Sequence, residues 1–525
     1  MTENATAIED WKPKGNPWVM TIPLMMAAFM FVLDETIANV ALPHMAGSFS
    51  VSRDESMWIL TSYLIASGII IPSVDFFSKL LGRKNFFMLC VLVFTTASFA
   101  CGIAKSIDMM ILSRILQGLG GGGLLPIAQA IMLESFPPEK RGKSTALFGL
   151  VVVVAPIIGP VIGGWITDNL SWPFIYFINV PIGVLSIVMA KKLLEDPPYA
   201  RRQKNVKIDK LGFLYLTLWL VTLQIVLDKG NNADWFNSPW VCWTTAASIV
   251  FGLMFIISQL KNKETLCDLK IFKDKNFLFG TTMQVVMQGV LLASLAILPQ
   301  FLQGMMGYDA FLSGLSMMPR GLGCFLSMII YGAISNKVDA RILITIGLTL
   351  LGIAGWELGF LNLQISQINI AIPNFIYGLG MGLSMIPIIT LSCATLSNAQ
   401  MTNASGLQNL FKNIGGAIGT SLVATLLSRF SQVHQFTLVG NLHQLNPNYT
   451  ARVSSTTHAL SQYTDVTSAT HMANYSLYNQ LLQQSTLSAF IDTFRVCSIA
   501  CFVIIPLMIF IKNKKETKNN TKQLL

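Results

Sequence analysis

Long apolar segments recur along the whole chain and are separated by short polar stretches. A helix rises 1.5 Å per residue, so about 17 to 25 mainly apolar residues are enough to cross a bilayer. Fourteen segments meet this length, and the pattern therefore predicts an all-α, polytopic membrane protein with 14 transmembrane helices. Their approximate limits are 18–43, 57–78, 86–104, 107–134, 144–168, 172–193, 211–228, 240–260, 277–303, 311–334, 342–363, 368–396, 405–428 and 486–511.

Composition and charge support this interpretation and orient the helices. Only 12% of residues are charged and 53% are hydrophobic, whereas a soluble domain carries about 25% charged residues. An even number of spans places both termini on one side. With that side cytoplasmic, 27 of the 36 Lys and Arg residues fall in cytoplasmic segments. Because cytoplasmic loops are enriched in Lys and Arg, we predict that both termini are cytoplasmic.

Two similar basic turns indicate an internal repeat. One covers 75–84 and the other 332–341, and each follows the second span of a group of six. Transporters are often built from such repeats. We expect a cytoplasmic N-terminus at 1–17, without a cleavable signal peptide, and a six-helix half at 18–193. A linker with two extra helices follows at 194–276, then a second six-helix half at 277–511 and a cytoplasmic tail at 512–525.

The second half contains a polar insert at 431–484, predicted to be extracytoplasmic. Its 54 residues exceed an ordinary loop, so it is either a flexible loop or a docking element for a partner. Four of the five histidines lie there, at positions 434, 443, 458 and 471, but their spacing matches no compact zinc site and favours solvated side chains. None of the eight cysteines lies in the insert, so no disulfide framework is expected.

Two adjacent acids, Asp34 and Glu35, lie inside the first span. The alternative is that this helix ends at Leu33 and both acids are in water, but the apolar stretch continues from Ile37 to Leu42. A charge within a bilayer costs at least about 2.5–3.5 kcal/mol, so an intramembrane acid suggests a functional role.

Arg114 in the fourth span is the candidate partner of Asp34. Counted from the outer ends of their spans, Asp34 and Arg114 lie at depths of about 13 and 10 Å, at 1.5 Å rise per residue. The two groups can therefore share one level. The alternative is that Arg114 only binds backbone carbonyl groups.

The second half carries further buried polar groups. Arg320 and Glu357 lie at comparable depths in spans ten and eleven, so a second acid–base pair is possible. Glu357 either faces a cavity, where it meets cationic substrate or a second proton, or belongs to a structural ion pair. Several amides and one tyrosine either line the same cavity or tie helices together. They are Gln129, Gln284, Gln288, Asn374, Tyr377 and Asn409.

Small residues and prolines in the fifth span predict a close helix contact. They are Pro156, Gly159, Pro160, Gly163 and Gly164. Glycines four residues apart let helices approach closely, and prolines bend the helix. The stretch is either a packing seam or a gasket between two halves that rock against each other. Gly82 and Arg83, in the first basic turn, are further candidates for a role in that movement.

Several of these segments resemble motifs of the fourteen-span drug/proton antiporters of the major facilitator superfamily, in the EmrB-like branch. In chain order the similar segments are Leu33-Asp34-x-Thr36-Ile37-x-Asn39-Val40-Ala41-Leu42-Pro43, Arg114-x-x-Gln117-Gly118, Pro156-x-x-Gly159-Pro160-x-x-Gly163-Gly164, Trp172 to Gly183, Asp228-Lys229-Gly230, Ser405-Gly406-Leu407 and Ile414-Gly415-Gly416. The chain departs from the pattern at Glu35, Asp75, Lys79 and Lys412.

The resemblance implies a major facilitator fold and a proton-coupled multidrug efflux transporter that confers antibiotic resistance. Such a protein would export hydrophobic or amphipathic compounds across the bacterial inner membrane by alternating access. It would use the proton motive force, without a cofactor, and would work with a periplasmic adaptor (EmrA-like) and an outer-membrane channel. Burial raises the pKa of a carboxyl group, and a nearby arginine lowers it. Because both effects change between the outward- and inward-facing states, one acid can load protons outside and release them inside. We assign proton coupling to Asp34, Glu35 and Arg114.

Two alternatives remain. The same fold can export one metabolite, such as a fatty acid or a siderophore. The chain can also be a non-transporting membrane receptor or an enzyme, but the sequence shows no nucleophile triad and no metal cluster. The glycine-rich stretch 118–123 lacks the Gly-Lys-Ser/Thr ending of a phosphate-binding loop. We therefore expect no enzyme activity, no metal and no nucleic-acid partner.

Overall fold

A computed structural model describes residues 15–136, 138–196, 209–261, 266–334, 338–396, 400–443 and 445–511. These residues form helices and turns, and no strand occurs among them. The all-α prediction is therefore confirmed. Most of the predicted cytoplasmic N-terminus, residues 197–208 of the linker and the predicted tail lie outside the described residues.

The first half is made of short and long helices that follow the predicted spans. They are α2 (Pro17–Phe49), α3 (Arg53–Ser56), α4 (Trp58–Ile70), the 3-10 turn η1 (Ile71–Ser73), α5 (Val74–Leu81), α6 (Arg83–Gly102), α7 (Ile107–Gly121), α8 (Leu124–Ser135), α9 (Pro138–Asn169), α10 (Phe174–Phe177) and α11 (Asn179–Leu193). The inserted pair is α12 (Lys210–Lys229) and α13 (Pro239–Lys261), joined through η3 (Trp235–Asn237).

The second half begins after η4 (Leu269–Lys273). Its helices are α14 (Lys275–Gly304), α15 (Ala310–Ile334), α16 (Ala340–Glu357), η5 (Leu358–Phe360), α17 (Gln367–Ser392), α18 (Met401–Val439), α19 (Pro447–Leu460), α20 (Val466–Val503) and η7 (Ile505–Phe510).

The described helices account for the predicted number of spans. Twelve helical segments are long and apolar enough to cross a membrane, and α9 is a bent thirteenth, with 44° between Leu147–Pro156 and Val161–Asn169. The remaining span begins with the shorter apolar helix α4, which continues through η1 into α5. The bend in α9 coincides with its two prolines, which remove backbone donors and kink a helix.

Several spans begin at a side-chain cap. Asn16 accepts a hydrogen bond from Trp18 N at the start of α2, and Ser106 from Met109 N at the start of α7. Asp209, Asp274 and Asp339 cap α12, α14 and α16 in the same way. A cap satisfies a backbone donor that the helix itself leaves unpaired, so these polar residues fix where each apolar helix starts.

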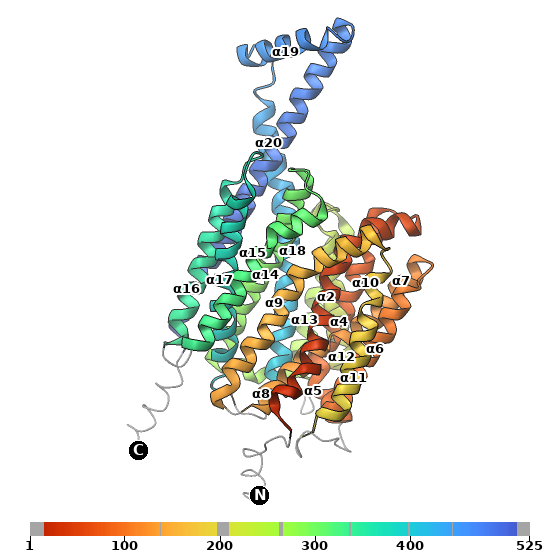
Figure 1. The fold of residues 1–525 in the computed structure, drawn as a ribbon, viewed down its shortest axis with the longest axis vertical. Helices are drawn as coiled ribbons and strands as arrows, with labels where there is room; N and C mark the ends of the chain where they lie inside the picture. Colours follow the sequence, from red (N-terminus) through yellow and green to blue (C-terminus); the bar gives the residue numbers. More distant parts are fainter. Residues whose placement is uncertain are drawn as a thin grey trace, which may run out of the picture.

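The two halves meet along two lines of helix contact. In one, α9 packs against α2 of its own half and against α15 of the other half. In the other, α18 packs against α8, η1 and α5. The inserted helix α12 contacts both α4 and α18, so the extra pair lies beside the junction of the halves. Figure 1 shows α9 between the green helices of the second half and the red helices of the first.

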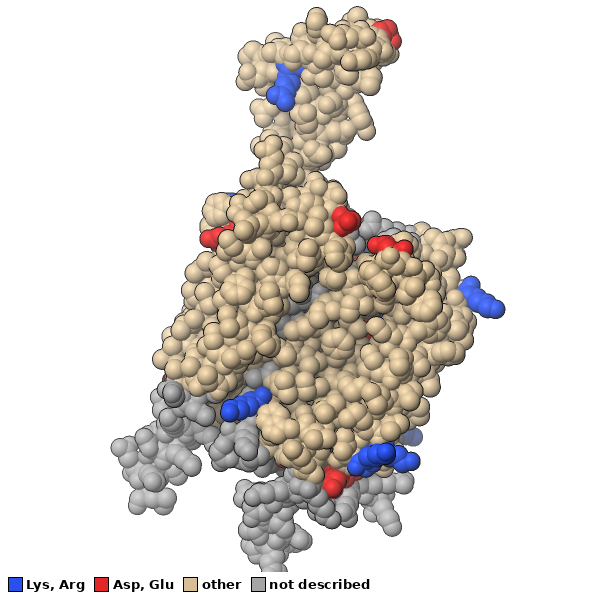
Figure 2. Space-filling view, in the orientation of Figure 1, with Lys and Arg blue, Asp and Glu red and all other residues tan. Residues whose placement is uncertain are grey.

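The middle of the bundle surface is apolar. Figure 2 shows that the charged side chains of the visible face lie mainly near its ends, with a broad uncharged region between them. Large apolar side chains such as Leu112, Trp243 and Ile249 are more than half exposed on the spans α7 and α13. Exposed apolar side chains over a band of this kind are typical of contact with lipid.

Residues 431–484, here named the arm, project from the bundle. The last turns of α18, helix α19 and the first half of α20 build the arm, which stands beyond the other helices at the end opposite to the start of α2 (Figure 1). The segment predicted as an insert is thus mainly helical, because spans thirteen and fourteen continue as helices past their apolar parts.

Candidate functional site

Asp34 and Arg114 form an ion pair inside the first half. Arg114 Nη1 donates to Asp34 Oδ2 at 2.5 Å, and both side chains are completely buried. The structure thus brings together the two residues that depth alone had matched. Arg114 Nε also donates to the carbonyl oxygen of Ile59 at 3.0 Å, so the arginine binds a backbone carbonyl as well as the acid.

Further polar side chains complete this first-half cluster, which we define as Asp34, Arg114, Gln117, Asn179 and Ser98. Gln117 Nε2 and Asn179 Nδ2 each donate to Asp34 Oδ1 at 2.8 Å. Both amides also donate to Ser98 Oγ, at 2.5 and 3.3 Å. The carboxylate of Asp34 therefore accepts three hydrogen bonds from three side chains.

Close helix packing positions Arg114. A Cβ atom on Gly118 would lie 2.5 Å from the Tyr63 carbonyl oxygen, and one on Gly122 would lie 2.3 Å from that of Ser67. Only glycine lets α7 approach α4 so closely. As a result the Arg114 guanidinium lies 4.1 Å from the centre of the Tyr63 ring, within range of a cation–π interaction.

Glu35, next to Asp34 on α2, is half-buried and is not a member of the first-half cluster. Neither acid of the first span lies beyond the helix, because α2 continues to Phe49 and the alternative of a helix that ends at Leu33 is wrong.

The second half has its own buried cluster, made of Arg320, Asn374, Ser294 and Tyr377. Arg320 Nε and Nη2 donate to Asn374 Oδ1 at 3.1 and 2.8 Å, and Nη1 donates to Ser294 Oγ at 3.0 Å. The guanidinium lies 4.2 Å from the centre of the Tyr377 ring. Arg320 is 1% exposed, and its hydrogen-bond partners are all neutral.

The possible pair between Arg320 and Glu357 is therefore not formed. All three guanidinium nitrogens of Arg320 bind Asn374 and Ser294 instead. Glu357 is exposed at the last residue of α16, beside η5. Depth along a helix did not reveal which way the Glu357 side chain points, so its assignment to a cavity is corrected here.

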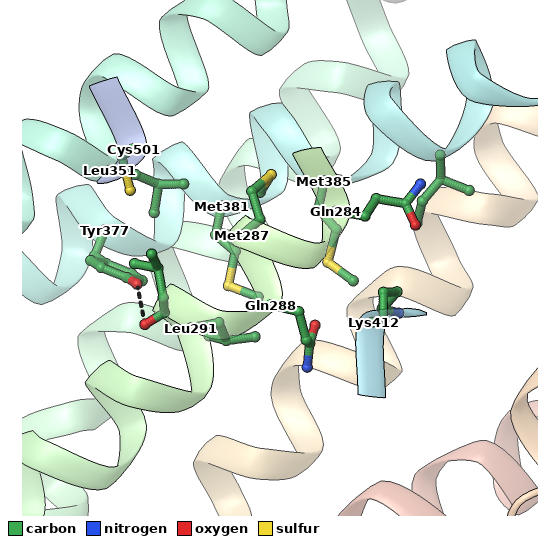
Figure 3. Close-up of a pocket in the computed structure, with 12 residues that line it drawn as sticks. Gln284, Met287, Gln288, Leu291, Leu351, Tyr377, Met381, Met385, Lys412 and Cys501 are labelled. Atoms are coloured by element: carbon green, nitrogen blue, oxygen red, sulfur yellow. Dashed lines mark hydrogen bonds between the residues drawn. The ribbon is translucent and has the colours of Figure 1, made fainter. Parts of the chain in front are cut away.

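Gln284, Gln288 and Tyr377 line a pocket that encloses about 440 Å³ of space, part of it open to solvent. Figure 3 shows Lys412, Gln284 and Gln288 toward one end, methionines in the middle, and Tyr377, Leu351 and Cys501 toward the other end. The complete lining is Gln284, Met287, Gln288, Val290, Leu291, Leu351, Tyr377, Met381, Met385, Ile389, Lys412 and Cys501.

The other predicted cavity residues tie helices together. Asn409 Nδ2 of α18 donates to Gln129 Oε1 of α8 at 3.4 Å, which links the two halves. Asn374 holds Arg320, as described above. None of these three is among the residues that line the pocket.

The glycines of α9 make the predicted close contact. A Cβ atom on Gly159 would lie 2.4 Å from Thr36 Oγ1, and one on Gly163 would lie 2.7 Å from Ile37 Cγ1. Gly164 is buried and Pro156 half-buried in the same helix, while the side chain of Pro160 lies outside the described part of the structure. Because α9 also packs against α15, this contact lies at the junction of the halves, which agrees with both alternatives, a packing seam and a gasket.

The first basic turn joins three spans at the end of the bundle where α2 begins. Gly82 has a φ of 83°, a backbone conformation that favours glycine, between α5 and α6. Arg83 forms an ion pair with Glu134 at the end of α8. The backbone N–H of Lys84 donates to Asp196 Oδ1 at 2.8 Å. The side chain of Asp75 lies outside the described residues.

Two charged residues received no role from the sequence, where Asp228 was only part of a family-like motif. Asp228 near the end of α12 accepts hydrogen bonds from Thr61 of α4 and from Gln224, and so fastens the inserted pair to the first half. Lys412 was noted only as a departure from a motif, although it lines the pocket. The available signal was the same for both, a charged residue within an apolar span.

Comparisons with known proteins agree with this architecture. The model of the Major Facilitator Superfamily matches residues 24–420. The chain is 34% identical to the multidrug export protein EmrB of Escherichia coli K12, over 83% of this chain and 85% of EmrB. It is 35% identical to the fatty acid resistance protein FarB of Neisseria gonorrhoeae, over 79% of this chain and 82% of FarB.

A solved structure shows the same fold. The crystal structure of the human organic anion transporter MFSD10 (TETRAN) matches with a TM-score of 0.59 and 12% identity, over 94% of this chain and 100% of MFSD10. With all-helical architecture, fourteen spans and a family match over most of its length, this chain belongs to the Major Facilitator Superfamily of transporters, and its EmrB relative confirms the EmrB-like resemblance.

Proposed function

We propose that the protein exports hydrophobic or amphipathic compounds across a bacterial inner membrane, in exchange for protons, by alternating access. The observation that carries the proposal is the enclosed ion pair of Asp34 and Arg114, which is fully buried in the first half. A charged acid in such a place suggests a function beyond packing. The relative EmrB is named a multidrug export protein, which supports the choice of cargo.

The contacts of α2 provide a route from proton to movement. When Asp34 is charged, Arg114, Gln117 and Asn179 hold α2 against α7 and α11. Protonation neutralises Asp34 and weakens the attraction to Arg114. The next residues on α2, Thr36 and Ile37, lie directly against α9, and α9 packs on α15 of the other half. A change at Asp34 is thus transmitted to the junction at which the halves rock.

The test is proton-coupled efflux by purified protein in liposomes. Asp34→Asn should abolish drug efflux driven by a pH gradient and the proton release that substrate induces. The matched control is Asp228→Asn, which removes a different acid of a span and should keep most of the coupled transport. If Asp34→Asn keeps both activities, Asp34 is not the proton carrier.

The arm extends this proposal to a partner. We propose that both termini are cytoplasmic, so that the arm projects into the periplasm, where it docks an adaptor that leads to an outer-membrane channel. Two observations support docking. The arm is helical, and Phe436, Leu445 and Tyr463 on it are each more than four-fifths exposed. Exposed apolar side chains on a projecting element are typical of an interaction site.

Deletion of residues 440–480 distinguishes docking from a transport role. The deletion should spare transport by the purified protein in liposomes but abolish resistance of cells with an outer membrane. Phe436→Ala combined with Tyr475→Ala should show the same split with less disturbance of the helices. Equal loss of both activities would refute a role limited to docking.

A second candidate cargo is a fatty acid. It is favoured by the relative FarB, which is named a fatty acid resistance protein and is 35% identical. Both candidates use the same fold and the same coupling site, so a panel of labelled drugs and fatty acids in the liposome assay decides between them.

A further inference from the structure

The arm leaves the bundle through α18 and α20, and one ion pair joins the two helices at this place. His434 of α18 lies at the start of the arm, and Asp492 of α20 lies just after its end. Nε2 of His434 is 2.8 Å from Oδ2 of Asp492. In Figure 1 the arm stands on these two helices. The pair therefore lies at the root of the arm.

Arg495, one turn further along α20, attaches Asp492 to the bundle. Arg495 Nη1 lies 3.7 Å from Asp492 Oδ1, and its Nη2 donates to the Gly359 carbonyl oxygen of η5 at 3.3 Å. The guanidinium also lies 5.6 Å from the centre of the Trp356 ring, at the end of α16. Arginine keeps its positive charge in proteins. Asp492 therefore has a permanent cationic neighbour and a fixed place beside η5, and we name His434, Asp492 and Arg495 the arm-root cluster.

Few other contacts of the arm hold α18 to α20 near the root. Phe436, which follows His434 closely in the sequence, is 86% exposed and buries little apolar surface. One other side-chain hydrogen bond joins the two helices within the described arm, from Gln435 Nε2 to the Tyr478 hydroxyl at 3.0 Å. Both of its groups are neutral at physiological pH. In the described arm, the contact of His434 with Asp492 is therefore the link between these helices whose strength can change with pH.

A proton on His434 strengthens this contact. Histidine is the side chain that ordinarily changes charge between pH 5 and 8. The side chains of His434 and Asp492 are 31% and 35% exposed, so solvent can deliver the proton directly. A neutral imidazole offers the carboxylate a hydrogen bond in only one of its two tautomers, whereas the imidazolium always donates and adds the attraction between opposite charges. The protonated ring therefore holds α18 to α20 more firmly, and this hold weakens as the pH rises and the ring loses its proton.

The other charged groups around the root belong to residue types that ordinarily titrate below pH 5 or above pH 8, namely carboxylates, arginines and tyrosines. On α18, Arg429 is already paired with Asp234 of the turn after α12. Further groups of these types at this end, on α20 and on the elements packed against it, are Tyr308, Asp309, Glu357 and Tyr478. Among the described residues, His434 is also the only one of the five histidines that pairs with a carboxylate.

We propose that His434 is a proton sensor at the root of the arm. The protonated ring holds α18 against Asp492, which Arg495 fixes to the bundle, and so keeps the arm in one direction. The neutral ring releases this contact, and the arm swings about its root. The sensor itself does not depend on transport, but its link to the proton gradient rests on the proposed function, in which the arm lies on the side that supplies protons. A large gradient then fixes the arm, and a small one frees it.

The experiment measures the mobility of the arm in the purified, full-length protein by pulsed electron paramagnetic resonance. Spin labels are attached at Ser454→Cys, exposed on α19, and at Ile368→Cys, exposed on α17, in a chain with Cys242→Ser, because Cys242 is the exposed native cysteine. Both labels belong to the second half, so rocking of the halves leaves their distance unchanged. The distance distribution should be narrow at about pH 5.5 and should broaden at about pH 8.

Replacing His434 tests the sensor in both directions. His434→Gln keeps a hydrogen-bonding side chain without the charge, so the distribution should be broad at both pH values. His434→Arg keeps a positive charge, so the distribution should be narrow at both. Asp492→Asn removes the charge of the acceptor and should also abolish the pH response. His458→Gln, which changes an exposed histidine of α19, is the matched control and should respond to pH as the wild type does.

Transport separates the sensor from the proposed function, because the distances are measured in detergent without a gradient or a substrate. A wild-type distribution that does not change with pH, or a pH response that survives in His434→Gln, would overturn the sensor. If the pH response depends on His434 but the wild type drives no proton-coupled efflux, the sensor stands and the proposed function fails. If efflux is coupled to protons while the arm shows no pH response, the proposed function stands and the sensor is refuted.

Discussion

Each half contains one buried arginine over a tyrosine ring, but the two arginines have different hydrogen-bond partners. Arg114 and Arg320 are both almost fully buried, and each guanidinium lies over a tyrosine ring, at 4.1 and 4.2 Å. Arg114 is on the fourth span of its half with Tyr63 on the second. Arg320 is on the second span of its half, with Tyr377 on the fourth. The acceptor on the first span is an acid, Asp34, in one half and a hydroxyl, Ser294, in the other.

This difference assigns different roles to the halves. In the first half the cation faces a group that can take up a proton, so the local charge can change during a transport cycle. In the second half the partners of Arg320 are Asn374, Ser294 and Tyr377, which stay neutral, so its charge is fixed. We interpret the first-half cluster as a switch and the second-half cluster as a permanent polar anchor beside the pocket that Tyr377 lines.

Removing the first arginine should have the largest effect. Arg114→Met leaves Asp34 buried without its cation, and breaking a buried ion pair in this way costs about 3–5 kcal/mol. Arg320→Met leaves no acid behind and should cost clearly less. The measurement is thermal unfolding of the purified variants in detergent.

The double variant Arg114→Met with Asp34→Asn is the control for this prediction. It removes both charges, so it should recover part of the stability lost in the single variant. Equal destabilisation by Arg114→Met and Arg320→Met would show that the acid makes no difference between the two clusters.

Loss of the acceptor in the second half is the next effect in size. Asn374 Oδ1 accepts from two nitrogens of Arg320, so Asn374→Ala leaves two buried donors unpaired and should cost about 1–3 kcal/mol. Unfolding temperature and coupled efflux are both measured. A fixed anchor predicts lower stability with the proton dependence of efflux retained, and a change in that dependence would contradict the distinction between anchor and switch.

The spans and the depth of each buried charge could be predicted from the sequence, because both follow from counting residues along a helix. The fourteen helices, Asp34 beside Arg114 and the contact of α9 with α2 all depend on helical rise and residue size. The direction of a side chain around its helix does not follow from depth, which is why Glu357 was misplaced. Gln117, Asn179 and Lys412 could not be assigned either, because their roles depend on which faces meet across helices far apart in sequence.

The contact between α9 and α2, next to the first-half cluster, should be sensitive to the addition of a single methyl group. In Gly159→Ala the new Cβ would meet Thr36 Oγ1, so α9 must shift away from α2, and overpacking of this kind costs about 1–3 kcal/mol. We expect slower efflux at a modest loss of stability. Adding Thr36→Ala removes the crowded hydroxyl and should restore the rate, and failure of this rescue would place the effect elsewhere.

The smallest effect concerns an ion pair of the same two residue types in water. Asp234 and Arg429 pair on the surface, between the turn after α12 and helix α18, and their side chains are 56% and 47% exposed. Hydrogen bonds from Asn237 and Arg429, and the charge of Arg429, lower the pKa of Asp234, so any stabilisation is present at neutral pH and is lost as pH falls through that lowered value. Exposed pairs contribute little, so Asp234→Asn should leave the unfolding temperature and coupled efflux at pH 7 unchanged. A loss comparable to that in Arg114→Met would mean that burial does not distinguish the inner pair, and that α18 is instead held to the inserted helices through this outer contact.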